Sequence, residues 1–265
     1  AAEKGYQPQR RAAFARLASQ LGADLLSPFA QRDWPKGLRI IPDGPLAYLP
    51  FEVLLVHAPQ PGAGASYADL PYLFDQVNLR YGYSASPEAL PRQGPHGRGY
   101  LGVAPRYQGP WPTASRRTLA VQQLGPLHNN IPEVEAVARL MRGQALTADE
   151  ASETRFKDRA SRYGVLHLST HTLYNDRNPM YSGLLFGQPD QVYHYVDTAE
   201  EDGVLHAYEI YDLDLRAELA VLSACQTGSG AYQRGEGVAS LARAFHYAGC
   251  PNVVMSLWPV DDLAT

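Results

Sequence analysis

The sequence predicts an α/β protein with a mainly parallel sheet that is flanked by helices. Three near-continuous apolar runs indicate strands buried on both faces of such a sheet, namely residues 165–170, 219–224 and 253–258. Segments with helical character alternate with these runs, at 132–141, 154–162 and 235–248. Strands that alternate with helices favour a parallel sheet built through right-handed crossovers.

The amino-terminal part of the chain predicts one helix and one short strand. Apolar residues from Phe14 to Leu26 recur at near-helical spacing, which indicates an amphipathic helix over residues 8–29. The apolar run 38–41 is followed by Pro-Asp-Gly-Pro and predicts a strand that ends in a turn. A stretch rich in Pro, Gly and Ala at 58–66 is typical of a surface loop.

Two further strands are expected at residues 77–81 and 100–104, and a long polar connection follows at 105–130. Loops of this length usually carry function or are disordered. We interpret the connection as a surface loop, with a processing or regulatory segment as the alternative.

Composition excludes several classes of protein. The 265 residues are 45% apolar, which is enough for a substantial core. The net charge of -4 gives no broad positive field, so no nucleic-acid partner is expected. No run of about 18 apolar residues indicates a membrane span. With only two cysteines, a disulfide framework is not indicated, and the cytoplasm is the simplest expectation.

The chain is expected to be a fragment of a longer polypeptide that forms a single domain over residues 1–265. Its first residue is Ala, and it stops at Thr265 within an apparent motif.

Two of the predicted strands end in reactive side chains. His171 follows the run 165–170, and Cys225 follows the run 219–224. Ligands of open α/β sheets bind beyond the carboxyl ends of the strands. If these two strands are neighbours, the imidazole and the thiol converge there. A thiolate can serve as nucleophile, with histidine as its base.

The residues around this pair suggest further roles. The backbone N–H groups of Thr172 and Cys225 are candidate oxyanion donors, because a Gly-containing loop follows Cys225 and allows close approach of a substrate carbonyl. Ser223 precedes Cys225 by two residues on the same strand face and is a candidate pocket residue.

Other chemistries fit the sequence less well. His167 and His171 would lie roughly 13 Å apart along a strand, too far to share one metal ion. We therefore interpret His167 as a core histidine, and Cys250 as structural. Neither a G-x-S-x-G serine elbow nor a phosphate-binding loop is present. No metal or cofactor is expected.

Several sequence blocks resemble the CHAT family of caspase-like proteins. They are IPDGPLAYLPFE at 41–52, LHLSTH at 166–171, PMYSGL at 179–184, LSACQTG at 222–228, GEG at 235–237 and SLWPVDD at 256–262. The blocks span nearly the whole chain in the family's order.

The resemblance implies a caspase-like sheet and a cysteine endopeptidase that cleaves selected protein targets through a His171/Cys225 dyad. One departure is Thr172, where the family usually has glycine. Residues 1–150 and 151–265 are candidates for a pseudo-caspase-like half and a catalytic half. The resemblance also implies activation by a partner or by an adjacent module such as tetratricopeptide repeats. A role in bacterial defence follows, with a gasdermin or an operon-encoded companion protein as candidate target.

Substrate preference depends on acidic residues near the strand ends. Separase places an acidic residue in its pocket for a basic P1 side chain, and Asp261 or Asp262 stands at the corresponding position here. A solvated turn or a helix N-cap is the alternative. Asp176 and Glu236 flank the two catalytic loops and are further candidates for pocket contacts. The rival function for the whole chain is a catalytically silent interaction module that keeps the fold.

Overall fold

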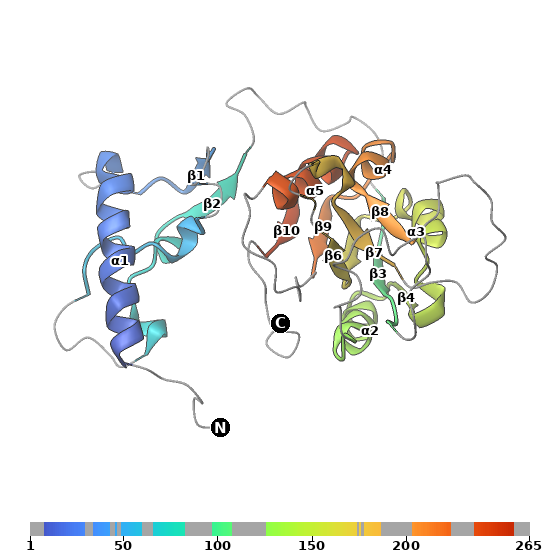
Figure 1. The fold of residues 1–265 in the computed structure, drawn as a ribbon, viewed down its shortest axis with the longest axis horizontal. Coiled ribbons are helices and arrows are strands. Elements are labelled where there is room, and N and C mark those ends of the chain that lie inside the picture. Colours follow the sequence, from blue (N-terminus) through green and yellow to red (C-terminus); the bar gives the residue numbers. More distant parts are fainter. Residues whose placement is uncertain are drawn as a thin grey trace. The chain divides into compact units, whose positions relative to one another are not determined.

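A computed structural model describes residues 8–29, 34–42, 46, 49–59, 66–82, 97–107, 126–173, 175, 178–186, 203–223 and 236–256. Its contacts divide the chain into two compact units, residues 1–87 and 88–265. The predicted fold class is confirmed, because the second unit is a parallel sheet with helices packed on it (Figure 1).

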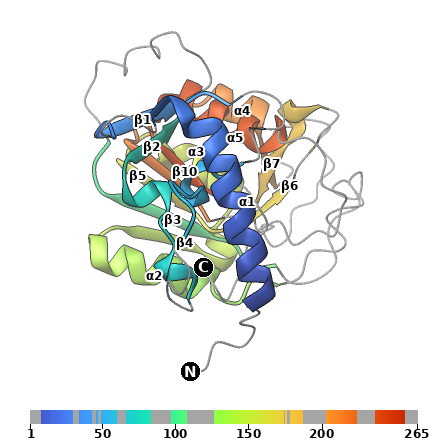
Figure 2. The ribbon, with the colours of Figure 1, turned by 90° about the vertical axis from the view of Figure 1, so that its left-hand side faces the viewer.

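The first unit contains helix α1 (Pro8–Leu26), which is one unbroken helix in Figure 2, and the parallel strands β1 (Gly37–Ile40) and β2 (Asn78–Tyr81). Short 3-10 turns cover Ser27–Phe29, Phe51–Val53, Tyr67–Asp69 and Leu73–Asp75. Gly22 stands four residues before the end of α1, where an added Cβ would overlap the Leu55 carbonyl. This glycine therefore lets the following chain lie directly against the helix.

The second unit is built on a five-stranded parallel sheet. Its strand order is β10-β9-β5-β3-β4. The strands are β3 (Tyr100–Ala104), β4 (Gln144–Thr147), β5 (Val165–Leu168), β9 (Leu219–Leu222) and β10 (Val253–Met255). The expected strands β3, β5, β9 and β10 are present, and β4 is an edge strand that the sequence did not predict.

The helices of this unit are α2 (Asn130–Met141), α3 (Glu153–Ala160), α4 (Ala207–Tyr211) and α5 (Glu236–Tyr247). They cover both faces of the sheet. Leu101 of β3 faces a core that contains Phe156 of α3 and Phe245 of α5. Gly102, the next residue, faces the opposite side, where an added Cβ would overlap Val134 of α2. Strand alternation thus separates α2 from the other helices.

A second, antiparallel sheet was not expected. It consists of β6 (His171–Leu173), β7 (Gly183–Leu185) and β8 (Val204–His206), in that order. The expected strand 165–170 therefore ends two residues early, at Leu168. After Leu168 the Ser169 N–H still donates to the Val103 carbonyl, the Ser169 and Thr170 hydroxyls bond Glu133 and the His171 carbonyl, and the chain enters the new sheet at His171.

Candidate active site

The strands that lead to His171 and Cys225 are neighbours, as the predicted dyad requires. Strands β5 and β9 pair in parallel, with Leu168 opposite Leu222 at the end of the ladder. His171 stands three positions after Leu168, and Cys225 stands three positions after Leu222. The two segments therefore leave the sheet as neighbours at its carboxyl edge. His171 and Cys225 each come three residues after the last paired position in the sequence.

His171 opens strand β6 with a completely buried side chain. Its imidazole packs against the phenol of Tyr107, with ring centroids 4.5 Å apart and planes tilted by 49°. Thr172, the candidate oxyanion donor, is also buried and lies opposite Leu184 of β7. The His171 imidazole is therefore buried against the Tyr107 ring at the start of β6.

The Tyr107 hydroxyl links the first residue of β6 to β7. The His171 N–H donates to Tyr107 Oη at 3.0 Å, and that hydroxyl donates to the carbonyl of Leu185 at 2.7 Å. His171 and Leu185 are register partners in the antiparallel ladder. Burial raises the pKa of Tyr107 far above its ordinary value, so the hydroxyl stays neutral and can accept one bond while donating the other.

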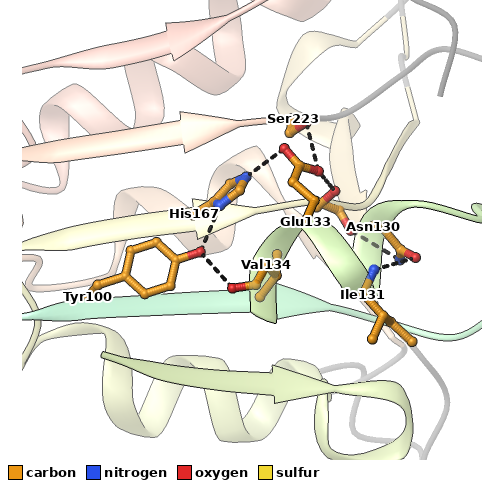
Figure 3. Close-up of polar contacts among 8 residues, drawn as sticks. Tyr100, Asn130, Ile131, Glu133, Val134, His167 and Ser223 are labelled. Carbon is orange, nitrogen blue, oxygen red and sulfur yellow. Dashed lines mark hydrogen bonds and ion pairs between the residues drawn. The ribbon is translucent and has the colours of Figure 1, made fainter. Parts of the chain in front are cut away.

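A carboxylate joins the ends of β5 and β9 (Figure 3). Glu133, in the first turn of α2, accepts a hydrogen bond from Ser169 Oγ at 2.8 Å and one from Ser223 Oγ at 3.4 Å, both through Oε2. Ser223, which we expected to line a pocket, thus lies at the carboxyl edge but donates to Glu133.

His167 supports the same carboxylate from within the sheet. Its Nε2 lies 3.3 Å from Glu133 Oε1, and its Nδ1 lies 2.7 Å from the Tyr100 hydroxyl. The side chain is buried on the α2 face, because its neighbours Leu166 and Leu168 face the opposite core. The interpretation of His167 as a core histidine is confirmed.

Asn130 ties this edge to the preceding strand. Its side-chain amide donates to the carbonyl of Pro105 at 2.7 Å and to that of Ser169 at 3.4 Å. Pro105 follows β3, and Ser169 follows β5, so one buried side chain satisfies carbonyls that extend beyond both strands. The order β10-β9-β5-β3-β4 reverses its direction between these two strands, which is where open α/β sheets form their binding crevice.

Cys250 is structural, as expected. It lies between α5 and β10 with a fully buried side chain, and its thiol donates to the Asn252 carbonyl at 3.3 Å. Burial raises the pKa of this thiol to about 11. Cys250 is therefore a poor nucleophile near neutral pH.

Several predicted site residues lie outside the described part of the chain: Cys225, Asp176, Asp261 and Asp262. For Glu236 the structure describes the backbone, at the start of α5, but not the side chain. The roles of these residues, and the oxyanion roles of the Thr172 and Cys225 N–H groups, stay predictions. Within the described ranges, no three His, Cys, Asp or Glu side chains gather as a metal site would need.

Sequence reasoning missed Glu133 and Tyr107. In the sequence Glu133 looks like any acidic residue in the first turn of a helix, where its negative charge interacts favourably with the helix dipole. Its position was nevertheless informative, because the helix after a parallel strand begins at the carboxyl edge of the sheet. Tyr107 falls three residues after β3 ends at Ala104, at that same edge.

None of the helices that the structure describes is long and apolar enough to cross a membrane.

The parallel sheet flanked by helices is an α/β architecture consistent with a caspase-like fold. The family model of the CHAT domain matches residues 11–265, nearly the whole chain, so the chain belongs to the CHAT domain family, which is related to caspase-like proteases.

Two curated relatives carry the same kind of segment. The chain is 28% identical over 165 residues to human tetratricopeptide repeat protein 28, over 53% of this chain and 7% of that protein. The mouse protein of the same name is 24% identical over 298 residues, over 98% of this chain and 11% of its own length. The chain therefore corresponds to a small part of these relatives.

Proposed function

We propose that the chain is a cysteine endopeptidase in which His171 and Cys225 form the catalytic dyad. The observation that carries the proposal is the β5–β9 register. Leu168 lies opposite Leu222, and His171 and Cys225 each follow this pair by three residues in the sequence. Membership in the CHAT family supports the same activity.

The residues supply a complete reaction. His171 accepts the thiol proton of Cys225, and the thiolate attacks the carbonyl carbon of the scissile peptide bond. Backbone N–H groups of Thr172 and Cys225 stabilise the resulting oxyanion. The C–N bond then breaks as the imidazolium returns its proton to the leaving amine. Water, deprotonated by His171, hydrolyses the thioester and restores the free thiol.

Burial of His171 supports a requirement for activation. The side chain is 0% exposed, and a peptide carbonyl must come within bonding distance of the dyad before the reaction can start. A partner or an adjacent module would open the site in the cell. The relatives are named for tetratricopeptide repeats, which favours a repeat module in this role.

The substrate is a selected protein, and the cytoplasm is the proposed setting. Asp261 and Asp262 are the proposed contacts for a basic P1 side chain, because a buried carboxylate pairs well with Arg or Lys. Asp176 and Glu236 would add contacts at the loops that flank the dyad. The proposed biological role is defence, with a gasdermin or a companion protein as the target of cleavage.

A cleavage assay on a peptide library tests the activity. The purified protein and its Cys225→Ala variant are compared with and without candidate activators, and cleaved bonds are identified by mass spectrometry. We expect cleavage after Arg or Lys that the variant lacks. Equal cleavage by both proteins would contradict the dyad, and cleavage after acidic or apolar residues alone would contradict the basic pocket. Absence of cleavage together with partner binding would favour a silent interaction module.

A further inference from the structure

One carboxylate oxygen holds together the two chain segments that carry the proposed dyad. Ser169 and Ser223 both donate to Glu133 Oε2 (Figure 3). Ser169 precedes His171 by two residues, and Ser223 precedes Cys225 by two residues. The last register pair between β5 and β9 is Leu168 with Leu222. The contact through Glu133 is therefore the next link between these segments among the described residues.

The carboxylate is itself held in place from two sides. Glu133 sits in the first turn of α2, whose buried Val134 packs against β3. Its other oxygen, Oε1, lies 3.3 Å from His167 Nε2, and His167 contacts the Tyr100 hydroxyl at 2.7 Å. A braced acceptor of this kind restricts the separation of the two serines more tightly than a mobile surface side chain would.

The charge of Glu133 strengthens the 2.8 Å bond from Ser169 Oγ, whereas the 3.4 Å bond from Ser223 Oγ is longer and weaker. Burial acts to raise the pKa of this carboxyl, but the close contact and electrostatic attraction of His167, together with hydrogen bonds from Ser169 and Ser223, outweigh burial and hold the pKa below its ordinary value. The group is therefore ionised near neutral pH. Hydrogen bonds to an ionised acceptor are shorter and stronger than those between neutral groups.

We propose that Glu133 is a positioning residue, which sets the separation of His171 and Cys225 by tying Ser169 to Ser223. This inference rests on the proposed dyad. A nucleophile and its base must lie within hydrogen-bond reach, and misplacement by about 1 Å can cost about 100-fold in rate.

Alkylation of Cys225 measures the dyad without any knowledge of the substrate. The intact protein is treated with iodoacetamide across a pH series, and the rate constant at Cys225 is followed by peptide mapping. Cys250 is the only other cysteine, and its burial and raised pKa make it an internal control for folding. A thiol paired with histidine reacts at lower pH than an ordinary thiol, whose pKa is about 8.5.

The double variant Ser169→Ala/Ser223→Ala removes the tie and leaves Glu133 and His167 in contact. We expect its Cys225 rate constant near pH 7 to fall about 10- to 100-fold, with the midpoint of the pH profile moving toward that of an ordinary thiol. Glu133→Gln should keep most of the rate, because its amide oxygen can still accept from both serines. Glu133→Ala should behave like the double serine variant.

Phe156→Leu is the matched control for general destabilisation. It removes volume from the buried core on the sheet face opposite α2 and none of the contacts of Glu133. We expect it to lower the melting temperature and to leave the pH profile of Cys225 unchanged. If the double serine variant, still folded, kept the wild-type profile, the positioning role would be wrong and the dyad would stand.

A different result would overturn the dyad itself. If wild-type Cys225 reacted as an ordinary thiol, with the same profile in a folded His171→Gln variant, the two residues would not be paired. In that case the proposed function fails, and the positioning role fails with it.

Discussion

The Tyr107 hydroxyl carries two buried backbone bonds at the residue that opens β6. Tyr107→Phe would leave the His171 N–H and the Leu185 carbonyl without this partner. Buried polar groups that lose their partner cost about 1–3 kcal/mol each, so with two such groups we expect the free energy of unfolding to fall by about 2–6 kcal/mol. Urea unfolding measures the change. Tyr163→Phe is the control, because that hydroxyl bonds Gln144 at an exposed position and should change stability by less than about 0.5 kcal/mol. Equal effects of the two variants would contradict the bridge.

The Glu133 carboxylate predicts a specific loss of stability in acid. Its pKa in the folded protein lies below the ordinary 4.5, since the bonds from His167 and the serines outweigh the effect of burial. A carboxyl whose folded pKa is lowered stabilises the fold fully above its ordinary pKa, and this contribution is lost as the pH falls through the folded value. The stability advantage of wild type over Glu133→Gln should therefore shrink as the pH falls below about 4.5.

Urea unfolding at a series of pH values measures this difference. Glu135→Gln is a control on the same helix, because its exposed ion pair with Arg139, at 3.9 Å, contributes little to stability. A difference between wild type and Glu133→Gln that stayed constant down to about pH 3 would show that the lowered pKa is not real.

Prediction from sequence succeeded at the residue scale where a residue's strand context was decisive. His167 lies inside an apolar run, so burial and a local partner were the expected outcome. Glu133 could not be recognised in the same way, because its partners Ser169 and Ser223 are 36 and 90 residues away in the chain. Only the strand order brings these three side chains together, and the strand order cannot be read from a single sequence.

Elements were predictable when they were long or uniformly apolar. Strand β3 was expected with the bounds that it has, because all five of its residues are apolar or glycine and all are buried. Strands β7 and β8 were missed because three residues are too few to show an alternation. Strand β4 was missed because it lies at the sheet edge and mixes polar with apolar residues.

Gly102 lets α2 approach β3 closely. An added Cβ at Gly102 would overlap the side chains of Val134 and Tyr100, so Gly102→Ala must displace α2 or the Tyr100 ring that contacts His167. Overpacking of this kind costs about 1–3 kcal/mol, and it should also displace Glu133, which belongs to the same helix. Gly37→Ala is the matched strand control, because its Cβ would meet only the Asn78 carbonyl at an ordinary 3.7 Å. We expect slower Cys225 alkylation in Gly102→Ala but not in Gly37→Ala, and the opposite ranking would contradict the role of this contact.

At the scale of the whole molecule, the chain has two sets of buried clusters. Among the residues that the structure describes, the clusters around Leu54 and Leu55 draw on positions before 88, and those around Leu166 and Leu185 draw on positions after it. The CHAT family match spans both units. The division into halves 1–150 and 151–265 remains a prediction about family organisation. The compact units divide after residue 87 instead, and strands β3 and β4, which precede residue 150, belong to the same sheet as β5.

Separate cores predict separate unfolding transitions. Gly22→Ala would overlap the Leu55 carbonyl in the first unit, and Gly102→Ala would overlap Val134 in the second. If each unit is stabilised by its own core, each variant should lower one calorimetric transition and leave the other within error, because mutations without shared partners act independently. Hydrogen exchange followed by peptide mapping assigns each transition to its unit. One common transition that both variants shift by the same amount would mean that the two units fold as a single cooperative body, and the dyad would then depend on the stability of residues 1–87 as well as on its own sheet.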